Sequence, residues 1–315
     1  MASERTGLTP ESIGDLTGRV AVVTGATSGL GLATSIELAH HGAHLLVTAR
    51  DADKGDAAAA RIRESAPGAL VQVVALDLAD LADVRRAAAE VVAEHPRIDI
   101  CVNNAGVMAT PKRRTVDGFE LQIGTNHLGH FTWTAGLWSA LVAGEARVVS
   151  VSSLAHARAG GIDLRSLTPL GAPNRYSRWG SYAESKLANL VFMVELDRRT
   201  KAAGVPVTSV AAHPGIASTN LTRTGSGLSR NPFAGVAMHQ AARLVSQSAE
   251  AGAAPLLVAA TEPSLTGGEY IGPQGLGGTR GRPGPASASQ HTIDPVLGEA
   301  LWAVSEIAGG VTFDV

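Results

Sequence analysis

The chain has 315 residues, of which 45% are apolar, with a formal net charge of −2 and one cysteine. It is long enough to bury a large core, cannot form an intrachain disulfide, and lacks the basic excess of a nucleic-acid-binding protein. Its N-terminal residues are too polar for a secretory signal, and no run approaches the roughly 18 apolar residues that span a bilayer. We expect a soluble, cytoplasmic protein that binds neither nucleic acid nor membrane.

Short apolar runs rich in β-branched residues alternate with longer, alanine-rich amphipathic segments along most of the chain. This alternation predicts an α/β fold of the Rossmann type, a doubly wound parallel sheet with helices on both faces. The predicted strands are residues 19–24, 43–48, 70–76, 98–102, 147–151 and 206–212. The predicted helices are residues 31–41, 53–65, 81–95, a long one within 118–141, 182–201 and a last one at 295–308.

Two stretches break this order. Residues 158–180 are rich in Gly, Pro and Arg and are interpreted as an insertion loop. Residues 272–289 are rich in Gly, Pro and Ser and are interpreted as a surface loop. Too few residues follow for a second domain, so we expect a single nucleotide-binding domain over residues 1–315. Its parts include an N-terminal extension at 1–16, a substrate loop at 216–235 and a C-terminal loop and helix at 272–315.

A glycine-rich turn directly follows the first predicted strand. It reads Thr24-Gly25-Ala26-Thr27-Ser28-Gly29-Leu30-Gly31, and a predicted helix begins at once. Glycines let the backbone turn sharply and approach a ligand, and a helix N-terminus offers N–H groups and partial positive charge to a pyrophosphate. The spacing is GxxxGxG rather than the common GxGxxG, but its place between strand and helix predicts a dinucleotide site. A tight turn without a ligand is the alternative.

Residues at the ends of the next two predicted strands are expected to contact the adenosine half of such a ligand. Arg50 follows the second strand, where a basic residue favours the 2′-phosphate of NADP, whereas Asp51 would serve the 2′-hydroxyl of NAD if the strand ended later. We therefore predict NADP(H), with NAD(H) as the alternative. Asp77 and Leu78 follow the third strand, and an aspartate there can accept from the adenine amino group. Its alternative role is the N-cap of the next helix, which Asp80 could also fill.

A tyrosine and a lysine suggest proton transfer. Tyr182 and Lys186 lie four residues apart in a predicted helix, hence on one face. A free phenol has a pKa of about 10, and a nearby ammonium favours the phenolate and lowers that pKa. Three further features lie near strand ends, where a doubly wound sheet binds ligands. They are the run Asn103-Asn104-Ala105-Gly106 after the fourth strand, Asn126 in the next helix, and Ser152 and Ser153 at the fifth strand.

With these residues the chain resembles the short-chain dehydrogenase/reductase family over residues 16–221. It is similar to the retinol-dehydrogenase-like and protochlorophyllide-reductase-like branch. That branch shares the VSSLAH run at residues 151–156, the SKLAN run at 185–189 and the HPG turn at 213–215. It also shares a long gap before the tyrosine, and here Ser153 and Tyr182 lie 29 positions apart (182 − 153).

The resemblance implies a role for each residue. Tyr182 would be the general acid in reduction and the base in oxidation, Lys186 would lower its pKa and hold the nicotinamide ribose, and Asn126 would hold a water that relays protons to Lys186. A serine would bind the substrate oxygen; family position favours Ser153, whereas strand alternation does not choose between Ser152 and Ser153. The predicted cofactor residues, from motifs and resemblance together, are Gly25, Thr27, Ser28, Gly29, Leu30, Gly31, Arg50, Asp77, Leu78, Asn104, Ala105, Gly106, Tyr182, Lys186, Pro214, Gly215 and Thr219.

Several residues receive a structural interpretation. The ten histidines lack ligand spacing with Asp, Glu or Cys, so no metal site is predicted. His127 and His130 are interpreted as helix-packing residues, and Cys101 as an inert core thiol. His156 lies near the serines, with substrate contact as a lesser alternative.

The helices at 118–141 and 182–201 are apolar on more than one face, so one face needs a second partner. We expect a homodimer or homotetramer; cover by the C-terminal segment is the alternative.

Together these features predict an NADP-dependent oxidoreductase, an alcohol dehydrogenase or carbonyl reductase that moves a hydride between nicotinamide and a carbonyl or alcohol carbon. We expect a small to medium, apolar substrate, because Val107, Met108, Leu154 and Leu221 lie near the expected pocket. Two alternatives stay open: a lyase or isomerase that uses the bound cofactor transiently, and a dinucleotide-binding regulatory protein without catalysis.

Overall fold

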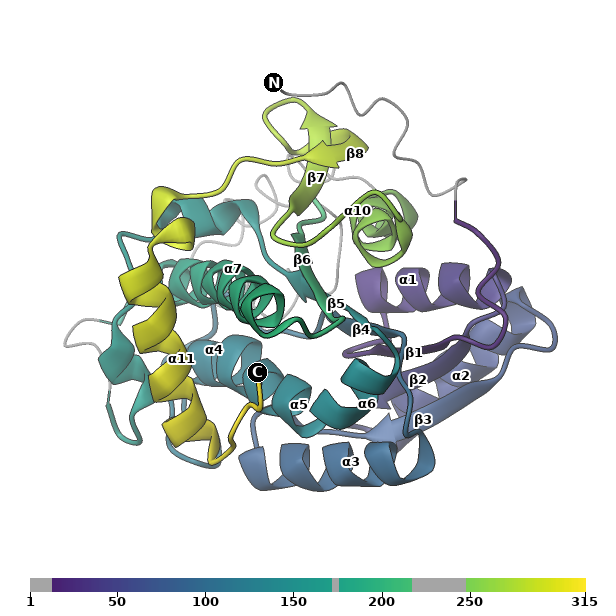
Figure 1. The fold of residues 1–315 in the computed structure, drawn as a ribbon, viewed down its shortest axis with the longest axis horizontal. Coiled ribbons are helices and arrows are strands. Elements are labelled where there is room, and N and C mark those ends of the chain that lie inside the picture. The colour runs from purple at the N-terminus through teal and green to yellow at the C-terminus, as the bar shows by residue number, and fades with distance from the viewer. Residues whose placement is uncertain (1–12, 172–175, 217–247) are drawn as a thin grey trace, which may run out of the picture.

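One sheet forms the centre of the molecule. The structure, a computed structural model, describes residues 13–171, 176–216 and 248–315, and within them eight strands stand in the order β3-β2-β1-β4-β5-β6-β7-β8 (Figure 1). All neighbours pair in parallel except β8, which runs antiparallel to β7 at the edge. The strands are β1 (Val20–Val23), β2 (His44–Ala49), β3 (Val71–Ala75), β4 (Ile100–Asn103), β5 (Arg147–Val151), β6 (Thr208–Ala212), β7 (Tyr270–Gly275) and β8 (Arg280–Pro285).

Helices cover both faces of the sheet (Figure 1). One core joins the sheet to α1, α2 and α10, and the other joins it to α3, α5, α6 and α7, with α11 outside α5 and α7. The α-helices are α1 (Gly29–His40), α2 (Ala52–Ser65), α3 (Leu81–Glu94), α4 (Leu121–Ile123), α5 (Gly129–Gly136), α6 (Trp138–Ala143), α7 (Arg178–Ala203), α10 (Ala249–Thr261) and α11 (Pro295–Gly309). The shorter helices are the π-helix η2 (Gly124–Leu128) and the 3₁₀ helices η3 (Leu154–Arg158), η4 (Leu164–Leu167) and η5 (Gln290–Ile293). In the described ranges no helix is long and apolar enough to cross a membrane.

The strands divide their side chains between the two cores, because successive residues of a strand point to opposite faces. In β1, Ala21 and Val23 belong to the core that includes α1 and α10, whereas Val22 belongs to the core that includes α3 and α5. All three are fully buried. Burial on both faces explains why the strands are apolar along most of their length. The predicted fold class, a Rossmann-type doubly wound sheet, is confirmed.

The interpretation of residues 272–289 as a surface loop is wrong. Most of this stretch forms β7 and β8, a hairpin that extends the sheet beyond β6 and has an irregular register between Pro273 and Gly275. Proline lacks a backbone donor and is tolerated on edge strands and at bulges. The Gly- and Pro-rich composition therefore belongs to an edge hairpin here.

Three helices also differ from expectation. Helix α10 is not predicted, because it is apolar on all sides and contains Pro255, so it lacks the amphipathic period that marks a surface helix. The long helix expected within 118–141 is divided into α4, η2, α5 and α6. Helix α7 begins at Arg178, inside the expected insertion loop, where the Ser177 side chain caps it by accepting from Gly180 N.

The C-terminal helix covers the second apolar face of α5 and α7. The ring centre of Trp302 in α11 lies 5.2 Å from Phe131 of α5, 6.0 Å from Phe192 of α7 and 4.8 Å from Phe313. From the sequence we expected a partner subunit to cover this face, with the C-terminal segment as the alternative. The structure shows cover by the C-terminal segment. The apolar face therefore no longer supports the expected homo-oligomer, which stays a prediction.

Removing the central ring of this aromatic cluster tests how strongly α11 is held. We expect Trp302→Ala to lower the free energy of unfolding by about 3–5 kcal/mol, because it leaves a cavity among three phenylalanines. Ile307→Ala on the same helix is the control; its side chain is 83% exposed, and the change should stay within about 0.5 kcal/mol. Urea unfolding with linear extrapolation measures both. Equal losses in the two variants would contradict the prediction.

Candidate active site

The turn between β1 and α1 exposes a helix N-terminus. Gly25 and Gly29 have φ of +65° and +56°, in the left-handed region that favours glycine. A side chain at Gly25 would come within 2.9 Å of Ala105, so there is no room for one. Ser28, the N-cap of α1, makes no side-chain capping bond, and the first turn contains no acid. This arrangement fits the pyrophosphate of a dinucleotide, because the first N–H groups of a helix lack intrahelical partners.

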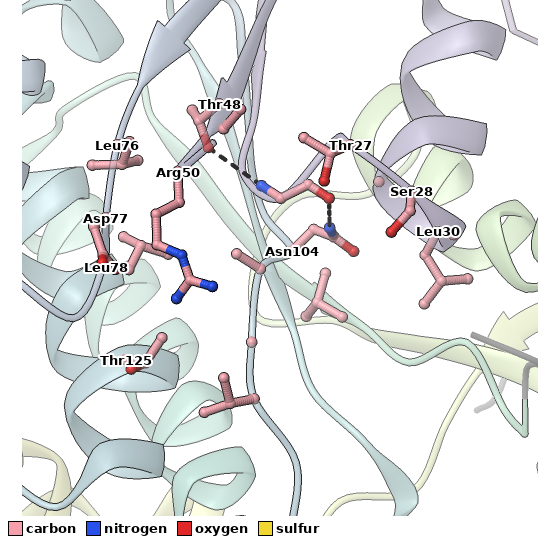
Figure 2. A pocket seen from close by; sticks show the side chains of 18 of the residues that line it. Thr27, Ser28, Leu30, Thr48, Arg50, Leu76, Asp77, Leu78, Asn104 and Thr125 are labelled. Carbon is pink, nitrogen blue, oxygen red and sulfur yellow. Dashed lines mark hydrogen bonds between the residues drawn. The ribbon is translucent and has the colours of Figure 1, made fainter. Parts of the chain in front are cut away.

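Asn104 fastens the loop after β4 to the glycine turn (Figure 2). Its Nδ2 donates to the Thr24 carbonyl at 2.7 Å and, at 3.5 Å, to the Gly25 carbonyl. The backbone N–H groups of Asn104 and Ala105 both donate to Thr24 Oγ1 at 2.9 Å. The two loops that border the nucleotide crevice are therefore one hydrogen-bonded unit.

His130 of α5 connects this unit to Asn126. Its Nε2 lies 2.8 Å from Thr24 Oγ1, and its Nδ1 lies 2.9 Å from the Asn126 carbonyl oxygen. A carbonyl only accepts, so Nδ1 carries the proton and Nε2 accepts from the Thr24 hydroxyl. Burial lowers the pKa of His130 to about 4, which keeps the ring neutral. His130 thus does more than pack helices, the role that the sequence suggested.

Asn126 lies in the π-helix η2 and clamps two segments. Its Oδ1 accepts from Val107 N at 2.8 Å, and its Nδ2 donates to Val107 O and Ser185 Oγ, both at 2.9 Å. Ser185 Oγ in turn donates to the Tyr182 carbonyl at 2.8 Å. Asn126 is fully buried and does not line the cleft; it joins the loop after β4 to the helix that carries Tyr182. Short π-helical turns are frequent at functional sites.

Tyr182 and Lys186 stand one turn apart on α7. Lys186 Nζ lies 5.9 Å from the centre of the Tyr182 ring and donates to the Val151 carbonyl at 2.9 Å. Burial lowers the pKa of Lys186 to about 8. Burial also raises the pKa of Tyr182, and a side-chain hydrogen bond with Ser153 opposes that rise. The lost hydration of the phenolate is the largest effect on this pKa, and the expected lowering of the Tyr182 pKa by Lys186 stays a prediction.

The structure distinguishes the two serines that strand alternation left open. Ser152 Oγ donates to the Lys186 carbonyl at 2.8 Å, so this hydroxyl holds the α7 backbone. Ser153 instead lies beside Tyr182, where its side chain lowers the pKa of the phenol, and its Oγ accepts from Ala155 N at 3.2 Å. Of the pair, Ser153 is the one whose side chain acts on the phenol.

A cleft of about 390 Å³ runs from the glycine turn to Tyr182 and Lys186. Of the predicted cofactor residues in the described ranges, only Gly215 does not line it; Thr219 lies outside the described residues, as does Leu221 of the expected pocket. Ser153 lies beside the cleft through its contact with Tyr182. The lining residues that the predicted cofactor set omits are Thr48, Ala49, Asp51, Lys54, Leu76, Val107, Thr125, Val151 and Ser152.

Arg50 and Asp51, at the end of the cleft where the adenosine is expected, differ in the partners of their side chains. Asp51 caps α2 by accepting from Lys54 N at 3.2 Å and forms an ion pair with Lys54 Nζ at 2.9 Å. Figure 2 shows the Arg50 side chain extending into the cleft. In the described part of the chain no acid forms an ion pair with Arg50. The cation is thus available to a ligand, whereas the carboxylate is already bound.

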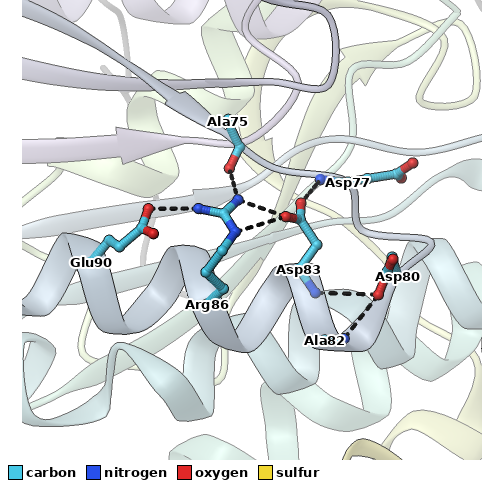
Figure 3. A network of polar contacts seen from close by, with 7 residues as sticks. All are labelled: Ala75, Asp77, Asp80, Ala82, Asp83, Arg86 and Glu90. Atoms are coloured by element: carbon cyan, nitrogen blue, oxygen red, sulfur yellow. Dashed lines mark hydrogen bonds and ion pairs between the residues drawn. The ribbon is translucent and has the colours of Figure 1, made fainter.

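A polar network fixes the loop at Asp77 (Figure 3). Asp80, not Asp77, is the N-cap of α3 and accepts from Ala82 N and Asp83 N at 3.0 and 3.2 Å. Asp83 Oδ2 accepts from Asp77 N at 2.7 Å, while Asp83 Oδ1 is paired with Arg86 at 2.6 Å. The Asp77 carboxylate accepts from Ala79 N at 2.9 Å and lines the cleft. The capping alternative for Asp77 is therefore excluded.

Comparison with known proteins places the chain in a family. The sequence model of the family described as short chain dehydrogenase matches residues 19–162. Retinol dehydrogenase 13 of Homo sapiens is 40% identical over 257 residues, which cover 81% of this chain and 76% of that protein. Polyprenol dehydrogenase of Mus musculus is 40% identical over 265 residues, which cover 81% and 75%. The chain belongs to the short-chain dehydrogenase/reductase family, in its retinol-dehydrogenase-like branch.

Solved structures agree with this membership. A crystal structure of an uncharacterized protein from Mycobacterium paratuberculosis has a TM-score of 0.79 and 40% identity, covering 98% of this chain and 100% of that one. A structure described as an NAD(P)-dependent gluconate 5-dehydrogenase from Beutenbergia cavernae, with bound NADP at low occupancy, has a TM-score of 0.62 and 26% identity, covering 81% and 95%. The predicted oxidoreductase class is confirmed for this short-chain dehydrogenase/reductase, whose family binds NAD(P).

Besides the other lining residues named above, no functional interpretation came from the sequence for the Thr24 hydroxyl, the His130 ring or Lys54. Thr24 meets Asn104 and His130 at separations of 80 and 106 positions, so no local pattern signals these contacts. Lys54 lies in a polar helix, which by itself indicates only an exposed side chain. Its place in the first turn of α2 makes it line the cleft, so it could also contact a ligand. In the described residues no group of three His, Cys, Asp or Glu side chains could hold a metal.

Two neighbouring aspartates test the adenosine end of the cleft. We expect Asp77→Asn to raise the Kd for NADPH about fivefold, because it removes one acceptor worth about 1 kcal/mol. Asp80→Ala should leave that Kd unchanged but lower the free energy of unfolding by about 1 kcal/mol through loss of the N-cap. Isothermal titration and urea unfolding measure the two effects. A weaker Kd in Asp80→Ala with a normal Kd in Asp77→Asn would reverse the assignment.

Proposed function

We propose that this protein is an NADP(H)-dependent carbonyl reductase and alcohol dehydrogenase, with Tyr182 as general acid and base. The observation that carries the proposal is the meeting of Ser153, Tyr182 and Lys186 at one end of a cleft whose other end is the glycine turn. Hydride transfer to a carbonyl needs a proton source, a donor that polarises the oxygen and a fixed approach to the nicotinamide. The three side chains supply the first two needs.

Tyr182 is the proposed proton donor in reduction. Its side chain lies at the cleft, and the residue is only 7% exposed. Burial raises its pKa, so the phenol stays protonated at neutral pH. A nicotinamide dinucleotide supplies the hydride when bound, and the substrate oxygen takes the Tyr182 proton as its negative charge grows. The Ser153 hydroxyl, which bonds to the same phenol, is placed to hold that oxygen.

Lys186 is the proposed partner for the nicotinamide ribose. An ammonium has three donors, and one of them is used by the Val151 carbonyl at 2.9 Å. The remaining two face the region of Tyr182 and Gly106; a side chain at Gly106 would stand 3.6 Å from Lys186 Nζ. The pKa of about 8 leaves this amine mostly charged but able to exchange a proton near neutral pH.

Oxidation needs the opposite charge state of Tyr182. A base must be deprotonated to accept the alcohol proton, and a raised pKa makes the phenolate scarce at neutral pH. The rate of alcohol oxidation is therefore expected to rise with pH as Tyr182 ionises.

NADP(H) is the proposed cofactor because two cations stand at the adenosine end of the cleft. Arg50 and Lys54 both line it, and Arg50 directly follows β2, where the 2′ substituent of the ribose lies in this fold. Asp51, the residue that would select a 2′-hydroxyl, is occupied as a helix cap. A phosphate gains charge-assisted hydrogen bonds from such side chains.

The proposed substrate is an apolar aldehyde, ketone or alcohol. Two relatives are named for retinol and polyprenol, both apolar alcohols. In this chain Val107 and Val151 line the cleft near Tyr182. The ring of Trp179, which is 56% exposed, lies edge-on to that of Tyr182 at 6.1 Å.

Arg50→Ala tests the cofactor preference. We expect it to raise the Kd for NADPH about tenfold or more, since hydrogen bonds between charged groups are worth about 1.5–3 kcal/mol, and to leave the Kd for NADH nearly unchanged. Arg61→Ala is the matched control, because Arg61 is an exposed arginine of α2 that does not line the cleft. Equilibrium titration with both nucleotides decides; an equal loss for NADPH and NADH would reject the role of Arg50.

Tyr182→Phe tests the chemistry. With NADPH and a panel of aldehydes and ketones, we expect kcat to fall by about 100-fold or more, with cofactor affinity retained. Tyr176→Phe is the control: that hydroxyl bonds to Gln122 and the Thr110 carbonyl away from the cleft. Net loss of NADPH absorbance, matched to alcohol formed, measures the rate and separates this activity from a lyase or isomerase. Turnover in Tyr182→Phe within a few-fold of wild type would refute the mechanism.

A further inference from the structure

A histidine three residues after Ser153 uses both ring nitrogens. His156 lies in η3 and is 2% exposed. Its Nδ1 stands 2.6 Å from the Ser153 carbonyl oxygen, and its Nε2 stands 3.3 Å from Ser289 N. A carbonyl only accepts and a backbone N–H only donates, so the proton is on Nδ1 and Nε2 is the acceptor. One neutral tautomer satisfies both bonds.

The surroundings keep this ring neutral and fixed. The Tyr270 ring packs edge-on against it at 5.5 Å, and the His213 ring lies 5.1 Å from Tyr270. Burial lowers the pKa of His156, and it lowers that of His213 to about 4. With both nitrogens bonded and the ring enclosed, His156 has no polar group left for substrate, which was the lesser alternative from the sequence.

The bonds of His156 act on the backbone of Ser153. The Ser153 carbonyl accepts from both His156 N, at 3.0 Å, and His156 Nδ1. The first bond belongs to the turn itself, whereas the second is made by a ring that is itself anchored to the segment between β8 and η5. Ser289 N thereby connects the C-terminal part of the chain to the residue whose hydroxyl meets Tyr182.

We propose that His156 is a positioning residue, which holds the Ser153 carbonyl through Nδ1 and the segment at Ser289 through Nε2, so that the Ser153 hydroxyl stays directed at the phenol and the substrate oxygen. The proposal rests on the proposed function, because it assigns Ser153 a place in carbonyl reduction. It adds a residue outside the cleft, and a C-terminal segment, to the groups that set the geometry of the reaction.

A pair of amide variants separates positioning from packing. In His156→Asn the amide nitrogen can stand where Nδ1 stands and donate to the Ser153 carbonyl, whereas in His156→Gln the amide reaches the position of Nε2 instead. Both variants lose the same ring contact with Tyr270. We expect His156→Asn to keep kcat within about threefold of wild type and His156→Gln to lose about tenfold or more, with unchanged Kd for NADPH.

The pH dependence of alcohol oxidation is a second measurement on the same variants. The Ser153 hydrogen bond lowers the pKa of Tyr182, so its loss should move the rise of alcohol oxidation in His156→Gln to higher pH. His156→Asn should keep the wild-type profile. Equal kcat and equal pH profiles in the two variants, whether both normal or both impaired, would overturn the proposal.

Ser289→Pro keeps the proposal testable if the His156 variants fail to fold. Ser289 has φ of −61°, which proline can adopt, and the substitution removes the N–H that His156 accepts. We expect kcat about two- to threefold lower than in Ser289→Ala, which lacks the same hydroxyl but retains the N–H, because the bond between His156 Nδ1 and the Ser153 carbonyl remains; equal kcat would overturn the proposal. Tyr182→Phe, run beside these variants, separates the two failures, because an active Tyr182→Phe refutes the proposed function itself.

Discussion

The hydroxyl of Thr24 joins three segments that the chain order keeps apart. It accepts from the Asn104 and Ala105 backbones and lies 2.8 Å from His130, whose other nitrogen binds the Asn126 carbonyl. The glycine turn, the loop after β4 and the π-helical turn are thus held by one buried oxygen. Such a network is stabilising only when every member is bonded. Here the neutral His130 ring completes it, and the glycine turn keeps a fixed position relative to the end of the cleft that holds Tyr182 and Lys186.

Helix α7 is fixed by the same kind of bonding. Asn126 reaches its backbone through Ser185, Ser152 binds the Lys186 carbonyl, and the Val151 carbonyl accepts from the Lys186 and Asn189 side chains. The Tyr182 phenol is therefore carried by a rigid element, as precise chemistry requires. On the outer side, α11 encloses α5 and α7 with aromatic rings, and His127 meets Ser305 at 2.9 Å. The chain's own C-terminal helix thus supports the two helices that carry the site.

Much of the fold follows from residues that are close in sequence. The apolar, largely β-branched runs give β1 to β6, because burial on both faces favours apolar residues at most positions of a strand. The edge hairpin of β7 and β8 was missed, since its glycines and prolines are tolerated only because it lies at an edge. Helix α10 was missed because a helix enclosed by protein loses the amphipathic period.

The sequence by itself determined the glycine turn, the Tyr182–Lys186 pair and the family, because each depends on spacing within one element or on motifs in a fixed order. Tertiary structure decided which of Ser152 and Ser153 lies beside the phenol, that Asp51 is bound while Arg50 extends into the cleft, and that the Tyr182 phenol is buried, which raises its pKa. Each of these depends on contacts and on hydration, and both arise only when segments far apart in the chain are brought together.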